Sequence, residues 1–356
     1  MKIKVKKNIN NIYMPTIIKI QEHINLENLF YLYSLDSSKI TQYFKQNTET
    51  KYYTEIDNIL SNYVFNGKSV SEKQYTTNDT TNNCNRLYCN NSLQKLQNDI
   101  ANFLCPDKCF DYDLKSARPS ITNYLCKIND LPNDKIDYYV RNRNNIMEKY
   151  EKSKDEIKQF IITLSNIDNP KSCGIRELDE FIKQENENKI KLLEIYKDVL
   201  PEKDYDSKKN PISSKYCELY YYFENKIVST AVNKYIDNVN CIKFDGFISR
   251  KKIDLQELNE LTKDYQVEWV IKPLDTRFKL GITKFNNIEK KLHKYLYGKF
   301  LFTPKDVENV NDSADKVSQY LKLWSARRAR PPGGCARWGA AAPPRSSSSQ
   351  RSSGRW

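Results

Sequence analysis

The sequence predicts an α+β fold in which an antiparallel sheet with a hairpin is interrupted by a largely helical insertion. Three observations support this prediction. The short apolar stretch Phe110 to Leu114 is typical of a buried strand. The segment Val239 to Arg250 holds two apolar runs around an Asp-Gly pair, which is a strong signal for a tight hairpin. Between these stretches, residues 135 to 200 carry apolar residues at helical spacing, broken at Pro170 and stopped at Pro201.

The elements before the first of these strands are of mixed type. Residues 1 to 80 read as an N-terminal α+β lead-in, with a strand at Ile17 to Ile20 and a helix from Leu26 to Phe44. The stretch Ser69 to Asn85 is polar, and we expect a loop there. Residues Ser92 to Leu104 have the apolar spacing of a helix.

The elements after the first strand follow from capping residues and periodicity. Pro119 suits the first turn of a helix, where the missing amide hydrogen costs no bond. Ser213 or Ser214 can cap a long helix that carries Tyr220, Phe223, Ile227 and Val228. A helix at Leu255 to Leu261 and a strand at Gln266 to Ile271 complete the predicted order.

Composition limits the classes of protein that this chain can belong to. The chain has 356 residues and a net charge of +13, which suits an anionic partner such as a nucleic acid. The last 32 residues hold seven arginines and no acidic residue, so more than half of this charge belongs to them. No apolar run reaches the ~18 residues of a membrane span, and the start lacks the apolar stretch of a signal peptide. We therefore expect an intracellular protein without a membrane partner.

The cysteines and the tail have simple interpretations. Nine cysteines are scattered without a pairing pattern, and the close pairs Cys84/Cys89 and Cys105/Cys109 lack two further ligands at the spacing of structural zinc. We interpret them as reduced core thiols. Residues 325–356 are rich in Arg, Ala, Gly, Pro and Ser, a composition that favours disorder. We expect a disordered basic tail, foreign to the fold; the alternative is a basic arm that binds phosphates.

Two aspartates stand where the predicted strands end. Asp113 ends the first strand, and Asp245 belongs to the Asp-Gly pair of the hairpin. Two carboxylates on neighbouring strands are what two Mg²⁺ ions need to clamp a nucleoside triphosphate during in-line attack. The sequence therefore points to nucleotidyl transfer. In the competing interpretation, Asp-Gly is merely the preferred hairpin turn and Asp113 is a solvated strand end.

Five segments resemble a known polymerase family in the order that the family requires. C-N-R-L-Y-C-N-N-S-L-Q-K-L, from Cys84 to Leu96, is similar to the G-R-L-x-S-x-x-P-N-L-Q element that precedes the first catalytic strand of superfamily A DNA polymerases. D-Y-D-L-K-S-A-R-P-S-I resembles the D-x-D-x-x-N-x-H-P-x-I of the transposon/virus polymerases, which are related to superfamily A and to phage-type single-subunit RNA polymerases. Y-Y-V-R-N-R, the helix from Ser214 to Glu224, and F-D-G-F follow. The likeness covers roughly residues 82 to 285.

The resemblance implies a polymerase palm with a catalytic hairpin and a fingers insertion. The palm would span residues 81–285, the helical fingers about 120–212, and a C-terminal helical segment 286–324. It further implies DNA-directed DNA synthesis with two Mg²⁺ ions, a primed DNA template and dNTPs as substrates. A helicase or primase is the partner with which such domains often occur.

The resemblance also assigns candidate roles to individual residues. Asp113 and Asp245 would be catalytic and hold the metal ions, with Glu224 as a substitute for the third carboxylate that the F-D-G pattern lacks. The triphosphate would be bound by Arg143, Lys154, Lys158 and Arg118. Arg86 and Gln94 would contact template and primer.

The chain departs from the family pattern at several positions. Asn85 and Asn91 replace the Gly and Pro of the first element, and Ser116 and Arg118 replace an Asn and a His near the site of sugar selection. Three alternatives therefore stay open. They are a catalytically degenerate nucleic-acid-binding replication module, an RNA polymerase or primase, and a structural α+β protein. For Lys154 and Lys158, an ordinary solvated helix face is an equal alternative.

Overall fold

The computed structural model describes residues 16–25, 69–77, 85–96 and 98–272, together with five single positions, Asn28, Leu29, Leu32, Tyr63 and Leu274. The predicted C-terminal helical segment 286–324, the tail 325–356 and most of the helix expected at Leu26 to Phe44 lie outside these residues. Within the described residues, antiparallel sheets combine with helices, which confirms the α+β class.

A four-stranded antiparallel sheet forms the centre of the fold. Its order is β4-β5-β3-β6, with β4 at Val239–Ile242, β5 at Gly246–Ser249, β3 at Phe110–Leu114 and β6 at Trp269–Lys272. The predicted bounds of β3 are confirmed. β6 begins later than predicted, because Gln266 adopts a left-handed conformation (φ 51°) after a short 3₁₀ turn.

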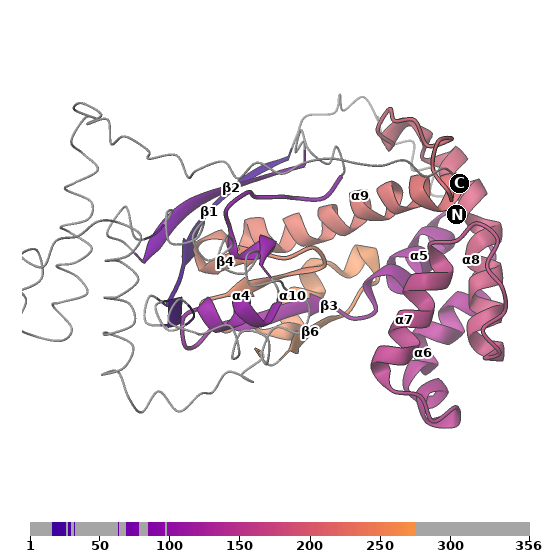
Figure 1. The fold of residues 1–356 in the computed structure, drawn as a ribbon, viewed down its shortest axis with the longest axis horizontal. Coiled ribbons are helices and arrows are strands. Elements are labelled where there is room, and N and C mark those ends of the chain that lie inside the picture. The colour runs from indigo at the N-terminus through magenta and orange to yellow at the C-terminus, as the bar shows by residue number, and fades with distance from the viewer. Residues whose placement is uncertain are drawn as a thin grey trace, which may run out of the picture.

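Helices account for most of the remaining described residues. The helices are α4 (Asn98–Leu104), α5 (Ala117–Ile128), α6 (Asp134–Lys149), α7 (Lys154–Ser165), α8 (Arg176–Ile195), α9 (Pro211–Lys234) and α10 (Leu255–Leu261). The 3₁₀ turns are Leu93–Lys95, Lys197–Val199, Ile236–Asn238 and Lys263–Tyr265. Figure 1 shows α5 to α8 gathered at one end of the molecule, the strands at the other, and α9 running between them.

The long helix α9 starts earlier than the sequence predicted. We expected Ser213 or Ser214 at its N-cap, but the helix begins at Pro211. Pro at the first helical position has no amide hydrogen to leave unpaired. The amides of Ile212 and Ser213 instead donate to the Asp168 carboxylate, at 3.1 and 2.6 Å. A residue distant in the sequence therefore caps α9, and local capping rules cannot identify it.

A second sheet corrects the loop that we predicted at residues 69 to 85. β1 (Ile17–His23) pairs with β2 (Val70–Thr76) in an antiparallel ladder. Most residues of β2 are polar, so the sequence does not show the alternation of buried and exposed side chains that is typical of a strand. In the structure, Lys73 and Tyr75 are the buried side chains of this alternation. Asn240 of β4 joins β1 to the central sheet, because its side chain donates to His23 O at 3.0 Å and accepts from His23 N at 2.8 Å.

The predicted hairpin is present, but Asp-Gly is not the centre of its turn. Residues 243–245 connect β4 to β5, and a bond from Lys243 N to Gly246 O at 2.9 Å leaves Phe244 and Asp245 at the turn. Gly246 is instead the first residue of β5, opposite Asp113 on β3. A Cβ at this position would lie 2.0 Å from the Tyr112 carbonyl oxygen. Glycine is therefore required here by the close approach of two strands.

A ring cluster under the sheet fixes β3. Tyr112 stacks on Phe247 at 5.3 Å between centroids, and Phe247 meets the edge of Trp269 at 5.6 Å. The Tyr112 hydroxyl donates to Ile253 O at 2.9 Å and accepts from Ile253 N at 2.6 Å. All three rings are almost fully buried. The strand that carries Asp113 is thus held by packing on one neighbour strand and on the loop before α10.

The buried carboxyl of Glu22 predicts a specific pH dependence of stability. Glu22 is fully buried, accepts from Leu93 N at 3.0 Å and from the Tyr63 hydroxyl, and its pKa is raised by burial to about 7. The folded state therefore binds more protons than the unfolded state between pH 4.5 and 7, so stability is lost as the pH rises through this range.

Glu22→Gln should remove this pH dependence, although its single amide oxygen can replace only one of the two carboxylate oxygens that accept from Tyr63 and from Leu93 N. The unfolding free energy of the variant, relative to that of wild type, should be roughly 3 kcal/mol higher at pH 8 than at pH 4.5. Urea unfolding at both pH values measures the difference. An identical pH dependence in the two proteins would contradict the assignment.

Candidate active site

Asp113 and Asp245 meet where β3 and the hairpin turn end side by side. The β3–β5 register sets Asp113 opposite Gly246, and Leu114 N donates to Asp245 O at 2.9 Å. This backbone pairing brings the two side chains together, close enough for the charge of Asp245 to act on Asp113. The structure thus juxtaposes the two aspartates that the sequence singled out.

The environment of this pair opposes a double negative charge. The Asp113 side chain is only 9% exposed. Burial and the neighbouring Asp245 raise the pKa of Asp113 to about 7, against the opposing effect of Lys272. A buried carboxyl group placed beside a half-buried one needs a cation or a shared proton. A strained pair of this kind is typical of functional sites.

Lys272 supplies a cation to the pair, and sequence reasoning missed it. Its ammonium group forms an ion pair with Asp113 Oδ2, and the side chain is 43% exposed. Burial lowers the pKa of Lys272, but the charges of Asp113, Asp245 and Asp111 outweigh this effect and raise it above its usual value. Only the β3–β6 register, which sets Lys272 opposite Asp111, reveals this neighbourhood.

Asp111 has a different partner from Asp113. Lys243, at the start of the hairpin turn, donates to Asp111 Oδ2 at 2.7 Å. The other oxygen, Oδ1, is buried without a hydrogen-bond partner in the described part of the chain. The charge of Asp111 is therefore balanced by Lys243, and Lys272 is left to the Asp113–Asp245 pair.

The aspartate pair opens into a cavity of about 710 Å³ between the sheet and the helices. Its walls come from the ends of β3 and β6, the first turn of α5, and the facing sides of α6, α7 and α9. Such a cavity at the junction of two structural layers is a common place for a small-molecule site. It is large enough for a nucleotide, and both aspartates line it.

Three of the predicted triphosphate-binding cations, Arg118, Arg143 and Lys158, line the same cavity. Arg143 on α6 donates from Nη1 to Ser116 Oγ at 3.0 Å, and its buried Nε has no hydrogen-bond partner among the described residues. Lys158 on α7 is exposed and also lines the cavity. Lys154 is the first residue of α7, and its side chain lies outside the described residues.

Arg86 and Glu224 form a buried ion pair beside the aspartates. Arg86 reaches Glu224 with Nε at 2.6 Å and with Nη2 at 3.1 Å. The guanidinium carbon lies over the ring of Tyr221, at 3.8 Å from its centroid, and over that of Phe244, at 4.7 Å. Burial raises the pKa of Glu224 to about 7, with Arg86 opposing and Asp245 adding to the shift. Both Glu224 oxygens are engaged, so this side chain serves as the partner of Arg86 instead of a free third metal ligand.

Gln94 is also occupied within its own segment. Its amide nitrogen donates to Leu87 O at 2.8 Å, and its amide oxygen accepts from Cys89 N at 3.1 Å. These bonds close the loop that places Arg86 against the cavity. Gln94 therefore shapes the 85–96 segment in this structure, and contact with template or primer would require it to leave these bonds.

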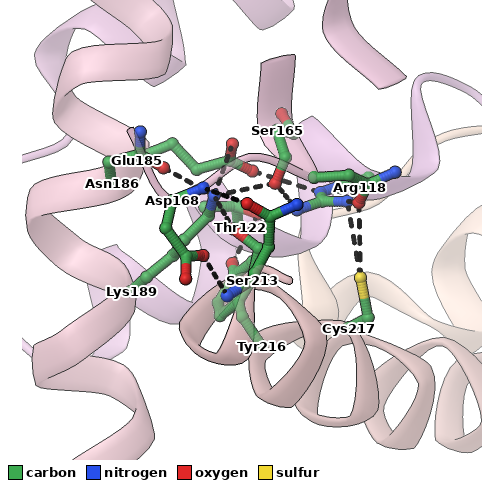
Figure 2. Close-up of polar contacts among 12 residues, drawn as sticks. Arg118, Thr122, Ser165, Asp168, Glu185, Asn186, Lys189, Ser213, Tyr216 and Cys217 are labelled. Carbon is green, nitrogen blue, oxygen red and sulfur yellow. Dashed lines mark hydrogen bonds and ion pairs between the residues drawn. The ribbon is translucent and has the colours of Figure 1, made fainter. Parts of the chain in front are cut away.

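Arg118 belongs to a buried polar cluster that joins four helices (Figure 2). Its guanidinium donates to Glu185 Oε1 on α8 at 3.2 Å, to Ser165 O at 2.7 Å and to Asn166 Oδ1 at 2.6 Å. Lys189 of α8 completes the cluster, with donations to Ser165 O at 2.8 Å and to Ser213 Oγ on α9 at 3.3 Å. Arg118 lines the cavity, but a triphosphate would have to replace these contacts.

Arg118→Ala therefore tests structure more than substrate binding. It leaves Glu185, which is fully buried, with only Lys189 at 3.8 Å as a cationic partner. We expect a loss of roughly 3 kcal/mol in unfolding free energy, because breaking a buried pair strands a charge. Arg141→Ala is the matched control, since Arg141 is 71% exposed in its pair with Asp137 and should change stability by less than about 0.5 kcal/mol. Equal stability of the two variants in urea would contradict this account.

The described cysteines agree with the interpretation of reduced thiols. Cys89, Cys105, Cys109, Cys126 and Cys241 are free and buried, and Cys173 and Cys217 are free and half-buried. Cys84, of the pair Cys84/Cys89, lies outside the described residues. No three His, Cys, Asp or Glu side chains in the described ranges are grouped so as to hold a metal ion. In the same part of the chain, no helix has the length and apolar character to cross a bilayer.

Comparison with known proteins identified no relative of this chain. Searches against protein-family models, curated proteins and solved structures returned no match.

Proposed function

We propose that this protein catalyses template-dependent nucleotidyl transfer, as a DNA polymerase of the superfamily A-like palm type. The observation that carries the proposal is the meeting of Asp113, on β3, with Asp245, in the turn before the adjacent strand β5, in the lining of a cavity that cations also line. In this proposal the four-stranded sheet is the palm, and the helices between β3 and α9 are the fingers. The fold by itself does not assign a function, so the argument rests on the site.

The donor set at the aspartate pair suits Mg²⁺. Carboxylate oxygens are the ligands that this hard cation prefers, and few protein ligands suffice because Mg²⁺ keeps waters and substrate phosphates in its shell. Asp113 and Asp245 would hold two ions, which would neutralise charge on the triphosphate and lower the pKa of the attacking hydroxyl. The repulsion between the two carboxyl groups supports the proposal, because a divalent cation relieves it.

The helical wall of the cavity would bind the triphosphate. Phosphoryl transfer needs positioning and charge neutralisation more than covalent chemistry from the protein. Arg143 has an unsatisfied buried donor there, and the exposed Lys158 adds a second positive charge. A planar guanidinium fork matches the oxygens of a phosphate. Arg143 is therefore the side chain that we assign most directly to the triphosphate, with Lys158 and Lys154 of α7 as the further candidates.

The Arg86 side of the cavity would face the primer and template. Arg86 is held by Glu224 and lies over the rings of Tyr221 and Phe244, so its orientation does not depend on a ligand. Phe244 is 37% exposed, next to Asp245. Aromatic and guanidinium faces stack on bases of any sequence. A primed DNA template and dNTPs are the substrates of this proposal, with a helicase or primase as partner inside the cell.

A second candidate is a nucleic-acid-binding module whose palm has lost its activity. The observation that favours it is the engagement of the expected polar groups by the protein itself. Lys272 pairs with Asp113, Arg86 with Glu224, and Arg118 with Glu185. Such pairs would hold the site closed to metal and triphosphate.

One experiment separates the two candidates. The full chain is tested for binding to a fluorescent primed DNA at several salt concentrations, and for primer extension with dNTPs in Mg²⁺ or in a chelator. Salt-dependent binding with Mg²⁺-dependent extension supports the polymerase. Salt-dependent binding without extension supports the inactive module. Binding without any salt dependence would contradict both and leave the structural α+β protein, while extension with rNTPs instead of dNTPs would indicate an RNA polymerase or primase.

A further inference from the structure

Lys272 is the one described cation in ion-pair contact with the Asp113–Asp245 pair. It ends β6, the strand next to β3, and is set opposite Asp111 by the register. Its ammonium contacts Asp113 Oδ2 directly and feels the charges of Asp245 and Asp111. Asp111 already forms an ion pair with Lys243 at 2.7 Å, so the charge of Lys272 mainly balances those of Asp113 and Asp245.

The charges at this position do not allow an ammonium group and a divalent ion to be present together. Two adjacent carboxylates carry two negative charges, and Lys272 balances one of them. A Mg²⁺ ion bound by the same carboxylate oxygens would meet a positive charge at ion-pair distance, where repulsion in a half-buried site is strong. One of the two cations must therefore move.

Lys272 is built to be the one that moves. Its side chain is 43% exposed, whereas that of Asp113 is 9% exposed and lies on a central strand of the sheet. A lysine side chain is a flexible four-carbon stem with a strongly hydrated charge, so it leaves a carboxylate at little cost once another cation takes its place. Lys272 also lines the cavity, so the ammonium can stay within reach of an incoming anion after it leaves Asp113.

We propose that Lys272 is a built-in competitor for the metal ion, a positioning residue that holds Asp113 and Asp245 together until a divalent cation displaces its ammonium group. This inference rests on the proposed function, because it concerns the same pair of carboxylates. It adds a residue and a property that the proposed function does not contain. The metal affinity of the site is set by competition with Lys272, and the free protein is kept from binding Mg²⁺ tightly before the nucleotide arrives.

The test is metal binding by the full chain without DNA or nucleotide, measured by isothermal titration calorimetry with Mg²⁺ and with Mn²⁺. Lys272→Gln should bind either ion about tenfold more tightly or better, since it removes the competing charge and keeps a polar side chain of similar length. Lys272→Arg keeps the charge and should bind metal no more tightly than wild type.

Lys115→Gln is the matched control. Lys115 lines the same cavity, but its ammonium pairs with Glu268 at 2.7 Å and does not contact the aspartates. The Lys115→Gln substitution removes one positive charge from the same cavity, and the metal affinity of this variant should stay within about twofold of that of wild type. Circular dichroism melting of each variant confirms that a folded protein is being titrated.

Each outcome of the titration has a distinct meaning. Tighter binding by Lys272→Gln, lost again in Lys272→Gln/Asp113→Asn, supports the proposal. Wild type that binds metal through Asp113, with no gain in Lys272→Gln, overturns the role of Lys272 and leaves the proposed function in place. If neither wild type nor Lys272→Gln binds metal at millimolar concentration, the metal site and the proposed function fail together with this inference.

Discussion

Replacing Asp113 or Asp245 with asparagine should abolish primer extension, with a loss of ~10³-fold or more in single-turnover rate. Asparagine keeps the shape of the side chain but removes the charge that would hold a metal ion. The two carboxyl groups lie together and line one cavity, so they are expected to act as a unit. The double variant should then be no more than about tenfold slower than either single variant, because the effects of residues that act together are not additive.

Stability distinguishes this loss from unfolding. Asp245 raises the pKa of Asp113, which means that the ionised pair opposes folding. Asp245→Asn relieves that repulsion, so its melting temperature should equal or exceed that of wild type. Asp237→Asn, on the 3₁₀ turn before β4, changes an exposed aspartate outside the cavity and should extend primers at the wild-type rate. An active Asp245→Asn protein would contradict the assignment of the site.

Gly246→Ala, which adds a single methyl group to the central sheet, should strongly lower the unfolding free energy. The new Cβ would lie 2.0 Å from the carbonyl oxygen of Tyr112 and 3.0 Å from the Cα of Asp113. Backbone atoms cannot turn aside as a flexible side chain can, so β3 and β5 must separate. We expect a loss of roughly 3 kcal/mol in urea unfolding. Primer extension should fall as well, because the same pairing holds Asp113 against Asp245.

Gly174→Ala is the control that separates a clash from a conformational cost. Gly174 has a φ of +79°, and an added Cβ would have nothing within 4 Å. Only the left-handed backbone conformation opposes the alanine, at about 1 to 2 kcal/mol, and catalysis should not change. If Gly246→Ala is as stable and as active as Gly174→Ala, the strand contact beside the aspartates is not as described.

Local signals in the sequence were sufficient for much of the fold. β3, α10 and the helices between residues 135 and 200 follow from apolar periodicity, and the hairpin follows from its flanking apolar runs. β2 was missed because its letters are polar, although Lys73 and Tyr75 point inward. The start of α9 was misplaced because Asp168, 43 residues before Pro211, supplies the cap. Local propensity carries no information on a partner so distant in the chain.

The candidate site divides in the same way. Asp113 and Asp245 were identifiable from residue type and strand position, because chemistry requires carboxylates at strand ends. Lys272 was not identifiable, since only the β3–β6 register shows that this lysine at the end of a strand lies near the aspartates. For Arg118, Gln94 and Glu224, residue type predicted ligand contacts, but each found a partner within the protein. Residue type alone does not show whether a charged or amide side chain bonds to the rest of the protein or to a ligand.

The most direct test of the central claim is single-nucleotide incorporation on primed templates that differ only in the next template base. Wild type, with Mg²⁺ and one dNTP at a time, should add one nucleotide only when that dNTP is complementary to the template base, and Asp245→Asn should add none. Primed DNA that is bound in a salt-dependent manner but never extended, with any of the four dNTPs, would contradict the account and establish an inactive nucleic-acid-binding palm in its place.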